Sequence, residues 1–188
     1  MDTSPTDPDL PLVRALQAGD DDALNELMRK YEGQLFRFIH HFCGDLENAR
    51  DLLQETFVRL YFQIHRFKPR AKFVTWLYTI ATNLCRDHAR SKRYRQAHVT
   101  DSMDATGTHI QLAAVALDPA AAADSRERLA ALEDAIAQLP HDLKSALLLF
   151  AIEQHSQHEC AEILGISVKA VETRVYRARK ILEKILLR

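Results

Sequence analysis

The sequence predicts an all-α protein, with two helical domains joined by a flexible linker and a helix-turn-helix in the second domain. Five glycines and six prolines in 188 residues leave few interruptions to helices. No stretch shows the sustained alternation of Val, Ile or Thr that is typical of strands. Apolar residues instead recur at steps of three and four, which is the period of an amphipathic helix.

The first domain is predicted to contain four helices. They are expected at about residues 9–18, 20–43, 45–64 and 72–95. Asp20 or Asp21 caps the second helix and Gly44 ends it, because aspartate accepts bonds from free backbone N–H groups and glycine accepts a left-handed exit. Pro69 separates the third helix from the fourth. The residues expected to face the core share the helical spacing and include Leu27, Phe38, Leu53, Phe57, Leu60, Tyr61 and Leu77.

A linker is predicted at residues 96–124, where the apolar periodicity fades. Such a length is unusual for a connection inside one compact domain, so the chain is divided into a domain at 1–95 and another at 125–188. The alanine run at 120–123 suits either a helix or a tether, and composition does not decide between them. Two further helices follow, at about 129–139 and 143–151.

The last third of the chain is typical of a helix-turn-helix that reads DNA. Ser156 and Glu159 form a predicted capping box, Gly165 ends that helix and Ser167 opens the next. The second helix carries an apolar stripe, made of Val168, Val171, Val175, Ala178 and Leu182. Its other arc is polar and basic, with Lys169, Thr173, Arg174, Tyr176, Arg177 and Lys180. Such an arc suits phosphates and the base edges of a major groove.

The distribution of charge supports two separate contacts with nucleic acid. The formal net charge is only -1, but acids and bases are segregated along the chain. Acidic residues gather near the N-terminus, one basic cluster lies at residues 86–95, and another lies at 169–188. A basic cluster is the electrostatic feature that a phosphate backbone requires.

Several classes of function are not supported. No apolar run is long enough to span a membrane and the N-terminus is acidic, so we expect a cytoplasmic protein. Three scattered cysteines predict reduced thiols rather than a disulfide framework. His40, His41 and Cys43 lack a second ligand pair, so no metal is expected. No glycine-rich phosphate loop or nucleophile–base pair appears, and we predict no catalytic residue, no cofactor and no enzyme activity.

Four segments, taken together and in order, carry a family resemblance. They are DLLQETFVR at 51–59, FVTWLYTIATN at 73–83, AEILGIS at 161–167 and RVYRAR at 174–179. The set strongly resembles the extracytoplasmic-function (ECF) group of bacterial RNA polymerase sigma factors, which belong to the sigma-70 family. The resemblance implies that 1–95 docks on polymerase and opens the minus-ten element, while 125–188 reads the minus-thirty-five element.

The resemblance also implies partners and roles for individual residues. Core polymerase would be contacted through its beta-prime clamp helices and its beta flap, and an anti-sigma factor would control the chain. The residues assigned to polymerase docking lie on the outer arc of the third helix: Asp51, Gln54, Glu55, Val58 and Arg59. The residues assigned to the minus-ten element lie in the loop and helix that follow: Phe67, Lys68, Arg70, Lys72, Asn83, Arg86 and Arg90.

Some of these assignments compete with structural roles. Phe67 either stacks on a base or belongs to the core, and Trp76 is interpreted as structural. The minus-thirty-five surface is assigned to Lys169, Thr173, Arg174 and Arg177. Arg174 is the candidate for a guanine, because its fork donates two hydrogen bonds.

Two positions depart from the family pattern, and one other class of protein remains open. Glu172 stands where many relatives carry a basic residue. It either pairs with a neighbouring basic side chain or accepts a hydrogen bond from a cytosine amino group. Cys160 replaces a branched aliphatic residue and is interpreted as a core substitution. The alternative function is a stand-alone helix-turn-helix regulator whose N-terminal bundle senses a ligand or dimerises.

Overall fold

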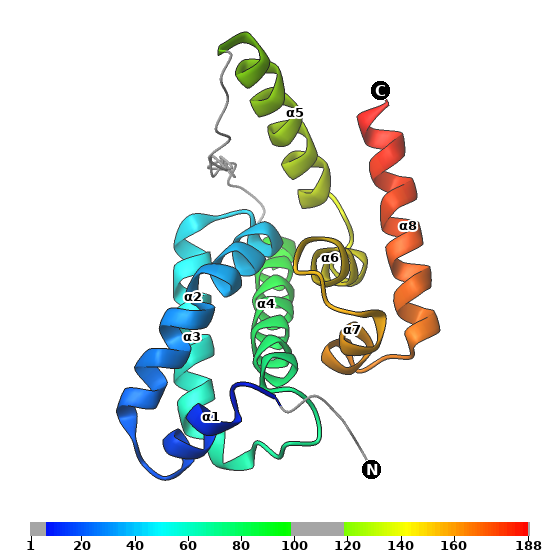
Figure 1. The fold of residues 1–188 in the computed structure, drawn as a ribbon. Helices are drawn as coiled ribbons and strands as arrows, with labels where there is room; N and C mark the ends of the chain where they lie inside the picture. The colour runs from blue at the N-terminus through cyan, green and yellow to red at the C-terminus, as the bar shows by residue number, and fades with distance from the viewer. Residues whose placement is uncertain (1–6, 99–118, 188) are drawn as a thin grey trace.

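The computed structural model describes residues 7–98 and 119–187, and all regular structure in these ranges is helical, as predicted (Figure 1). We call residues 7–98 the N-terminal module and 119–187 the C-terminal module. The N-terminal module contains α1 (Leu10–Gln17), α2 (Asp21–Cys43), α3 (Leu46–Gln63), a 3-10 turn (Ile64–Arg66) and α4 (Phe73–His98). The C-terminal module contains α5 (Pro119–Ala137), α6 (His141–Leu147), a π-helical turn (Leu148–Ile152), α7 (Gln157–Leu164) and α8 (Val168–Leu186).

The ends of α2 follow the predicted capping residues, and α3 begins with a further aspartate cap. The Asp20 side chain accepts a bond from the N–H of Asp22, and the Asp45 side chain accepts one from the N–H of Asn48. Gly44 ends α2 in the left-handed conformation, with φ of 71°, which a side chain at that position would strain. Local hydrogen bonding therefore sets these boundaries.

Both ends of the predicted linker at 96–124 are helical. Helix α4 continues to His98, and α5 already begins at Pro119, so the alanine run at 120–123 is helical. The remainder of the predicted linker, 99–118, lies outside the described residues.

The core of the N-terminal module lies between α2, α3 and α4. Phe38, Leu60 and Leu77 are all completely buried there. Tyr61 was expected in this core but is 41% exposed. The buried face of α3 includes Leu53, Phe57 and Leu60. Tyr61 lies at the edge of that face, because successive helical residues are rotated by about 100°.

The C-terminal module contains the predicted helix-turn-helix. Ser156 and Glu159 form the capping box at the start of α7, and Gly165 ends that helix with φ of 64°. The Ser167 side chain caps α8 by accepting from the N–H of Ala170. Four of the five predicted stripe residues of α8 are buried: Val171, Val175, Ala178 and Leu182. Val168 is partly buried against the same core.

A π-helical turn after α6 was not expected from the sequence. It spans Leu148–Ile152 and buries both Leu148 and Leu149 completely. The chain then leaves through Gln154, which has a positive φ of 58°. The wider turn places Glu153 and His155 against α4.

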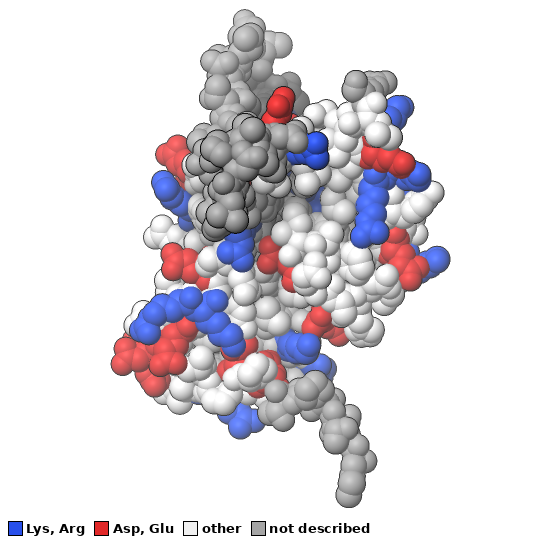
Figure 2. All heavy atoms as spheres, turned by 45° about the horizontal axis from the view of Figure 1, so that its top comes forward, with Lys and Arg blue, Asp and Glu red and all other residues white. Residues whose placement is uncertain are grey.

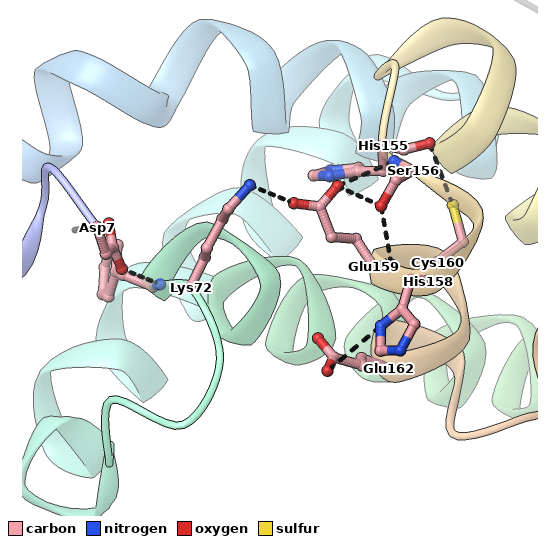
Figure 3. Close-up of polar contacts among 9 residues, drawn as sticks. Asp7, Lys72, His155, Ser156, His158, Glu159, Cys160 and Glu162 are labelled. Atoms are coloured by element: carbon pink, nitrogen blue, oxygen red, sulfur yellow. Dashed lines mark hydrogen bonds and ion pairs between the residues drawn. The ribbon is translucent and has the colours of Figure 1, made fainter. Parts of the chain in front are cut away.

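The two modules are packed against each other rather than separated by their tether. Helix α4 lies between the N-terminal bundle and α6 and α7 (Figure 1). The hydroxyl of Tyr78 in α4 donates a hydrogen bond to Glu153 at 2.6 Å, and its ring meets His155 edge-on at 4.6 Å between centroids. Lys72 Nζ lies 2.8 Å from Glu159 Oε1 (Figure 3).

Glu159 has two structural roles at once. It completes the capping box of α7 through Ser156 and also binds Lys72 of the other module (Figure 3). Burial opposes its ionisation, but the hydrogen bonds from Lys72 and Ser156 outweigh burial and lower the pKa of Glu159 to about 2. The ionised carboxylate is therefore the form that the fold stabilises.

We predict that Glu159→Gln lowers the free energy of unfolding by about 1 kcal/mol at neutral pH. Since the pKa of Glu159 falls from its usual 4.5 to about 2 on folding, its contribution is complete above pH 4.5 and is lost as the pH falls toward 2. Urea titrations at several pH values should show the two proteins converging in that window. Glu162→Gln is the matched control on α7, and a difference that does not depend on pH would contradict this role.

Candidate nucleic-acid interface

The loop between the 3-10 turn and α4 divides into a buried and an exposed part. Phe67 is only 6% exposed, and its ring packs against Phe73 at 5.9 Å and Trp76 at 5.3 Å between centroids. The structure thus places Phe67 in the core, the second of the two roles considered for it, and Trp76 lies partly buried beside it. Lys68 and Arg70 are exposed.

Lys72 is engaged by the C-terminal module. Its hydrogen bond to Glu159 raises the pKa of Lys72, and the charge of the carboxylate adds to this effect. The start of α4 beside it is held by Asp7, whose side chain accepts a hydrogen bond from the N–H of Phe73 at 2.6 Å. Figure 3 shows Lys72 extending from the α4 side toward α7. In this arrangement Lys72 is thus paired with a carboxylate.

The polar residues predicted on α4 differ in their surroundings. Asn83 and Arg90 are exposed, and Arg90 lies 3.9 Å from Asp87. Arg86 is half-buried, and burial lowers its pKa. Its Nε is buried without a hydrogen-bond partner. A buried donor left without an acceptor costs free energy.

A basic cavity lies where α4 meets the start of α6. It has a volume of about 280 Å³ and is lined by Arg86, Ala89, Arg90, Arg93, Pro140, His141 and Asp142. Asp142 is the one acidic residue among the described residues that line the cavity, and it also lies 3.6 Å from Arg174 Nη2 of α8. The first predicted basic cluster therefore faces the C-terminal module.

The predicted base-reading arc of α8 is only partly exposed. Lys169 and Arg177 are exposed, and Thr173 Oγ1 donates to the carbonyl of Lys169 at 2.9 Å. Glu172 lies 3.0 Å from Lys169 Nζ, so it pairs with a neighbouring basic side chain. The Arg174 side chain is 25% exposed, and its Nη1 is buried without a partner. Arg174 is thus held at the edge of the arc, against α6.

The outer face of α3 presents charged and apolar side chains together. Asp51 and Gln54 are exposed, and Arg59 Nε donates to Glu55 at 2.7 Å. Val58 is 41% exposed. Beside it lies a mainly apolar groove of about 400 Å³ between α2 and α3, lined by Asp21, Leu24, Asn25, Met28, Gln54, Phe57, Val58, Tyr61 and Phe62.

Phe62 is the residue of this face that the sequence reasoning missed. It is 75% exposed, an unusual state for a phenylalanine. Its spacing in the sequence could have placed it on the predicted docking face. Asp51, Glu55, Val58 and Phe62 follow one another at steps of four, three and four. Such steps place them on one face of a helix.

The charges on the molecular surface are mixed. Figure 2 shows Lys and Arg side chains beside Asp and Glu in small groups on the face that it presents, without one continuous basic area. Lys72 is paired with Glu159, and Lys169 is paired with Glu172. The basic side chains proposed to meet DNA are in several cases paired within the protein.

The described ranges contain neither a metal-binding cluster nor a membrane-spanning helix. No three His, Cys, Asp or Glu side chains within 7–98 and 119–187 are grouped so that they could hold a metal ion. No helix in these ranges combines the length and the apolar character needed to cross a membrane.

Comparison with known proteins agrees with the two modules. The family model "Sigma-70 region 2" matches residues 27–95, and "Sigma-70, region 4" matches residues 129–182. The ECF RNA polymerase sigma factor SigW of Bacillus subtilis is 33% identical over 92% of this chain and 93% of its own length. The RNA polymerase sigma-H factor of Pseudomonas aeruginosa is 34% identical over 95% of this chain and 93% of its own length.

A solved structure extends the similarity to the arrangement of the helices. The structure of CnrH in complex with the cytosolic domain of CnrY has a TM-score of 0.70 and 28% identity, over 95% of this chain and 96% of that one. A stand-alone regulator is not favoured by these matches. Since both family models and relatives spanning nearly the whole chain agree with the geometry of its two helical modules, the chain belongs to the ECF group of sigma-70 RNA polymerase sigma factors.

Proposed function

We propose a division of labour between the two modules in promoter recognition. The domain at 1–95 docks on core polymerase and opens the minus-ten element, and the domain at 125–188 reads the minus-thirty-five element. The chain has no chemistry of its own, and it acts with polymerase in the cytoplasm. Polymerase supplies the catalytic step and holds the two modules at a fixed separation, which raises their effective concentration on one promoter.

The division of α8 into two faces carries this proposal. Its apolar stripe is buried in the C-terminal module, while Lys169, Thr173 and Arg177 remain on the exposed arc. A helix held in this way can enter a major groove without giving up its own packing. Lys169 and Arg177 supply positive charge, and Arg174 at the edge of the arc supplies the bidentate fork for a guanine.

Minus-ten recognition is assigned to polar side chains of the loop before α4 and of α4 itself. Lys68 and Arg70 are exposed in the loop and form a basic track for a single strand. Asn83 contacts a base or the backbone, and Arg86 and Arg90 contact phosphates. Lys72 joins the track when Glu159 releases it. Phe67 contributes by supporting the loop from the core rather than by stacking on a base.

Polymerase docking is assigned to the outer face of α3 and the groove beside it. A partner helix with apolar side chains would fill the groove between Val58, Tyr61 and Phe62, and polar contacts to Asp51 and Gln54 would fix its orientation. The beta-prime clamp helices are the proposed occupant. The exposed Glu55–Arg59 pair lies at the border of this surface.

An anti-sigma factor is the proposed inhibitor. The similar protein CnrH was solved in complex with the cytosolic domain of CnrY. In the present structure Lys72 and Arg174 are both paired with carboxylates of the C-terminal module. An inhibitor that binds both modules together would keep Lys72 paired with Glu159 and away from DNA.

For the minus-thirty-five reader, we predict that Arg174→Ala relaxes preference at one guanine position by about 1–3 kcal/mol. Transcription from a library of minus-thirty-five variants with the core polymerase measures this preference. Arg174→Lys keeps the charge but loses the guanidinium group that donates two hydrogen bonds to guanine, so the same loss of preference is expected. Lys180→Ala serves as a charge control with the preference retained. An unchanged profile for both Arg174 variants would refute the assignment.

For the docking surface, we predict that Phe62→Ala weakens binding to core polymerase about tenfold, because a central aromatic anchor commonly contributes more than 1 kcal/mol. The double variant Asp51→Ala, Gln54→Ala should also bind more weakly. Competition binding against the unmodified chain gives both affinities. Leu187→Ala removes an equally exposed apolar side chain from the other module and should bind normally. Full affinity in both α3 variants would remove this surface from the proposal.

A further inference from the structure

The loop at 67–72 is held at both of its ends by residues 7–17, which we call the N-terminal segment. Gln17 of α1 is half-buried, and its Nε2 donates to the carbonyl of Ile64 at 2.8 Å and to that of Phe67 at 3.3 Å. A side-chain amide has two N–H donors, so both bonds can form at once. The two carbonyls lie where the chain leaves the 3-10 turn and enters the loop. Gln17 therefore fixes the start of the loop.

Asp7 holds the other end, where the loop becomes α4. The first N–H groups of a helix lack partners inside the helix, and Lys72, which precedes α4, has a side chain that cannot accept a hydrogen bond. Asp7 Oδ2 instead accepts from the N–H of Phe73 at 2.6 Å, from a position 66 residues away in the sequence (Figure 3). Asp7 Oδ1 also accepts from the N–H of Asp9 at 3.0 Å. The N-terminal segment thus supplies the cap of α4.

The N-terminal segment is itself anchored on α2. Asp9 is only 2% exposed, and its carboxylate accepts hydrogen bonds from Lys30 and from the hydroxyl of Tyr31. The Tyr31 ring lies 5.9 Å from that of Phe73, measured between centroids. These contacts give the segment a fixed place from which it reaches both ends of the loop.

The tip of the loop carries the two exposed cations assigned to the minus-ten strand, Lys68 and Arg70. The N–H of Arg70 donates to the carbonyl of Lys68 at 2.7 Å and closes a tight turn around Pro69. Proline also fixes its own φ. With both ends held and the tip closed, the loop carries its cations on a constrained backbone.

We propose that Gln17 and Asp7 are positioning residues for promoter opening, which hold the loop in the form that captures a single DNA strand. Lys68 and Arg70 make the contact with that strand. This inference rests on the proposed minus-ten role of the loop. A loop that is ordered beforehand loses less conformational entropy when it binds. Both positioning residues act through the loop, and neither is assigned a contact with DNA.

A third contact on the loop comes from the other module. Lys72 at the end of the loop is bound by Glu159 of α7. That bond joins the two modules, so it is lost when they separate. The bonds made by Gln17 and Asp7 lie within the N-terminal module and are retained. The N-terminal segment therefore keeps the loop ordered in the state in which it is proposed to meet DNA.

Hydrogen exchange in the free full-length chain tests the support itself. Gln17→Met keeps the length of the side chain and removes both donors, and Asp7→Ala removes the acceptor. In either variant we expect amide exchange within 67–73 to accelerate at least about threefold. Gln34→Met, at an exposed position of α2, is the matched control and should exchange as the unmodified chain does. Unchanged exchange in both Gln17→Met and Asp7→Ala would overturn the inference.

Strand opening tests the role in promoter recognition. The assay uses core polymerase and a promoter that carries a fluorescent adenine analogue in its minus-ten element. Gln17→Met and Asp7→Ala should open this element about three- to tenfold more slowly. Their affinity for core polymerase should stay unchanged, because docking is assigned to the outer face of α3. Asp7→Asn keeps an oxygen acceptor, so its rate should lie within about twofold of the unmodified chain.

A loop without its cations separates positioning from general stability. The variant Lys68→Ala, Arg70→Ala should open the promoter slowly, and adding Gln17→Met should lower its rate by less than about twofold further. A further loss as large as in the unmodified chain would show that Gln17 acts through the stability of the module, and would overturn the positioning role.

The same measurements distinguish failure of this inference from failure of the proposed function. Slow opening by the loop variant, with normal opening by Gln17→Met and Asp7→Ala, would refute the positioning role alone. Normal opening by the loop variant itself would refute the minus-ten role of the loop, and the positioning role would fail with it.

Discussion

The packing of α4 against the C-terminal module is the constraint that organises this molecule. Tyr78 joins α4 to Glu153 and His155, and Lys72 at its start joins it to Glu159. The same helix carries Arg86 at the basic cavity. One helix thus belongs to the N-terminal core, to the contact between the modules and to the proposed promoter surface. Movement of the C-terminal module changes the surroundings of all these groups together.

Several cations proposed to meet DNA are paired with carboxylates of the protein itself. Lys72 and Arg174 each lie beside a carboxylate of the C-terminal module, and Lys169 is paired with Glu172. Exposed pairs of this kind stabilise the fold only weakly, by about 0–1 kcal/mol. A polyphosphate backbone can therefore replace the carboxylates as partners, whereas the buried contacts of Tyr78 must first separate. The closed arrangement and DNA binding therefore compete for Lys72.

Local features were predictable from the sequence, and the contact between the modules was not. The Ser156–Glu159 capping box, the Gly165 exit and the Ser167 cap each depend on residues within one turn, so spacing alone identifies them. The Lys72–Glu159 pair joins residues 87 positions apart, and no helical period contains that information. The exposed Phe62 was missed because core prediction assigns phenylalanine to the interior, although its spacing matched the predicted docking face.

Transcription by reconstituted polymerase tests the central claim most directly. The claim is that two modules, packed together in the free chain, act at two promoter elements when mounted on core polymerase. Run-off transcription should be measured on templates in which only the spacer between the minus-thirty-five and minus-ten elements varies. We expect initiation that requires both the chain and core polymerase and falls sharply away from one spacer length. Absence of initiation, or initiation that ignores the spacer, would contradict the account.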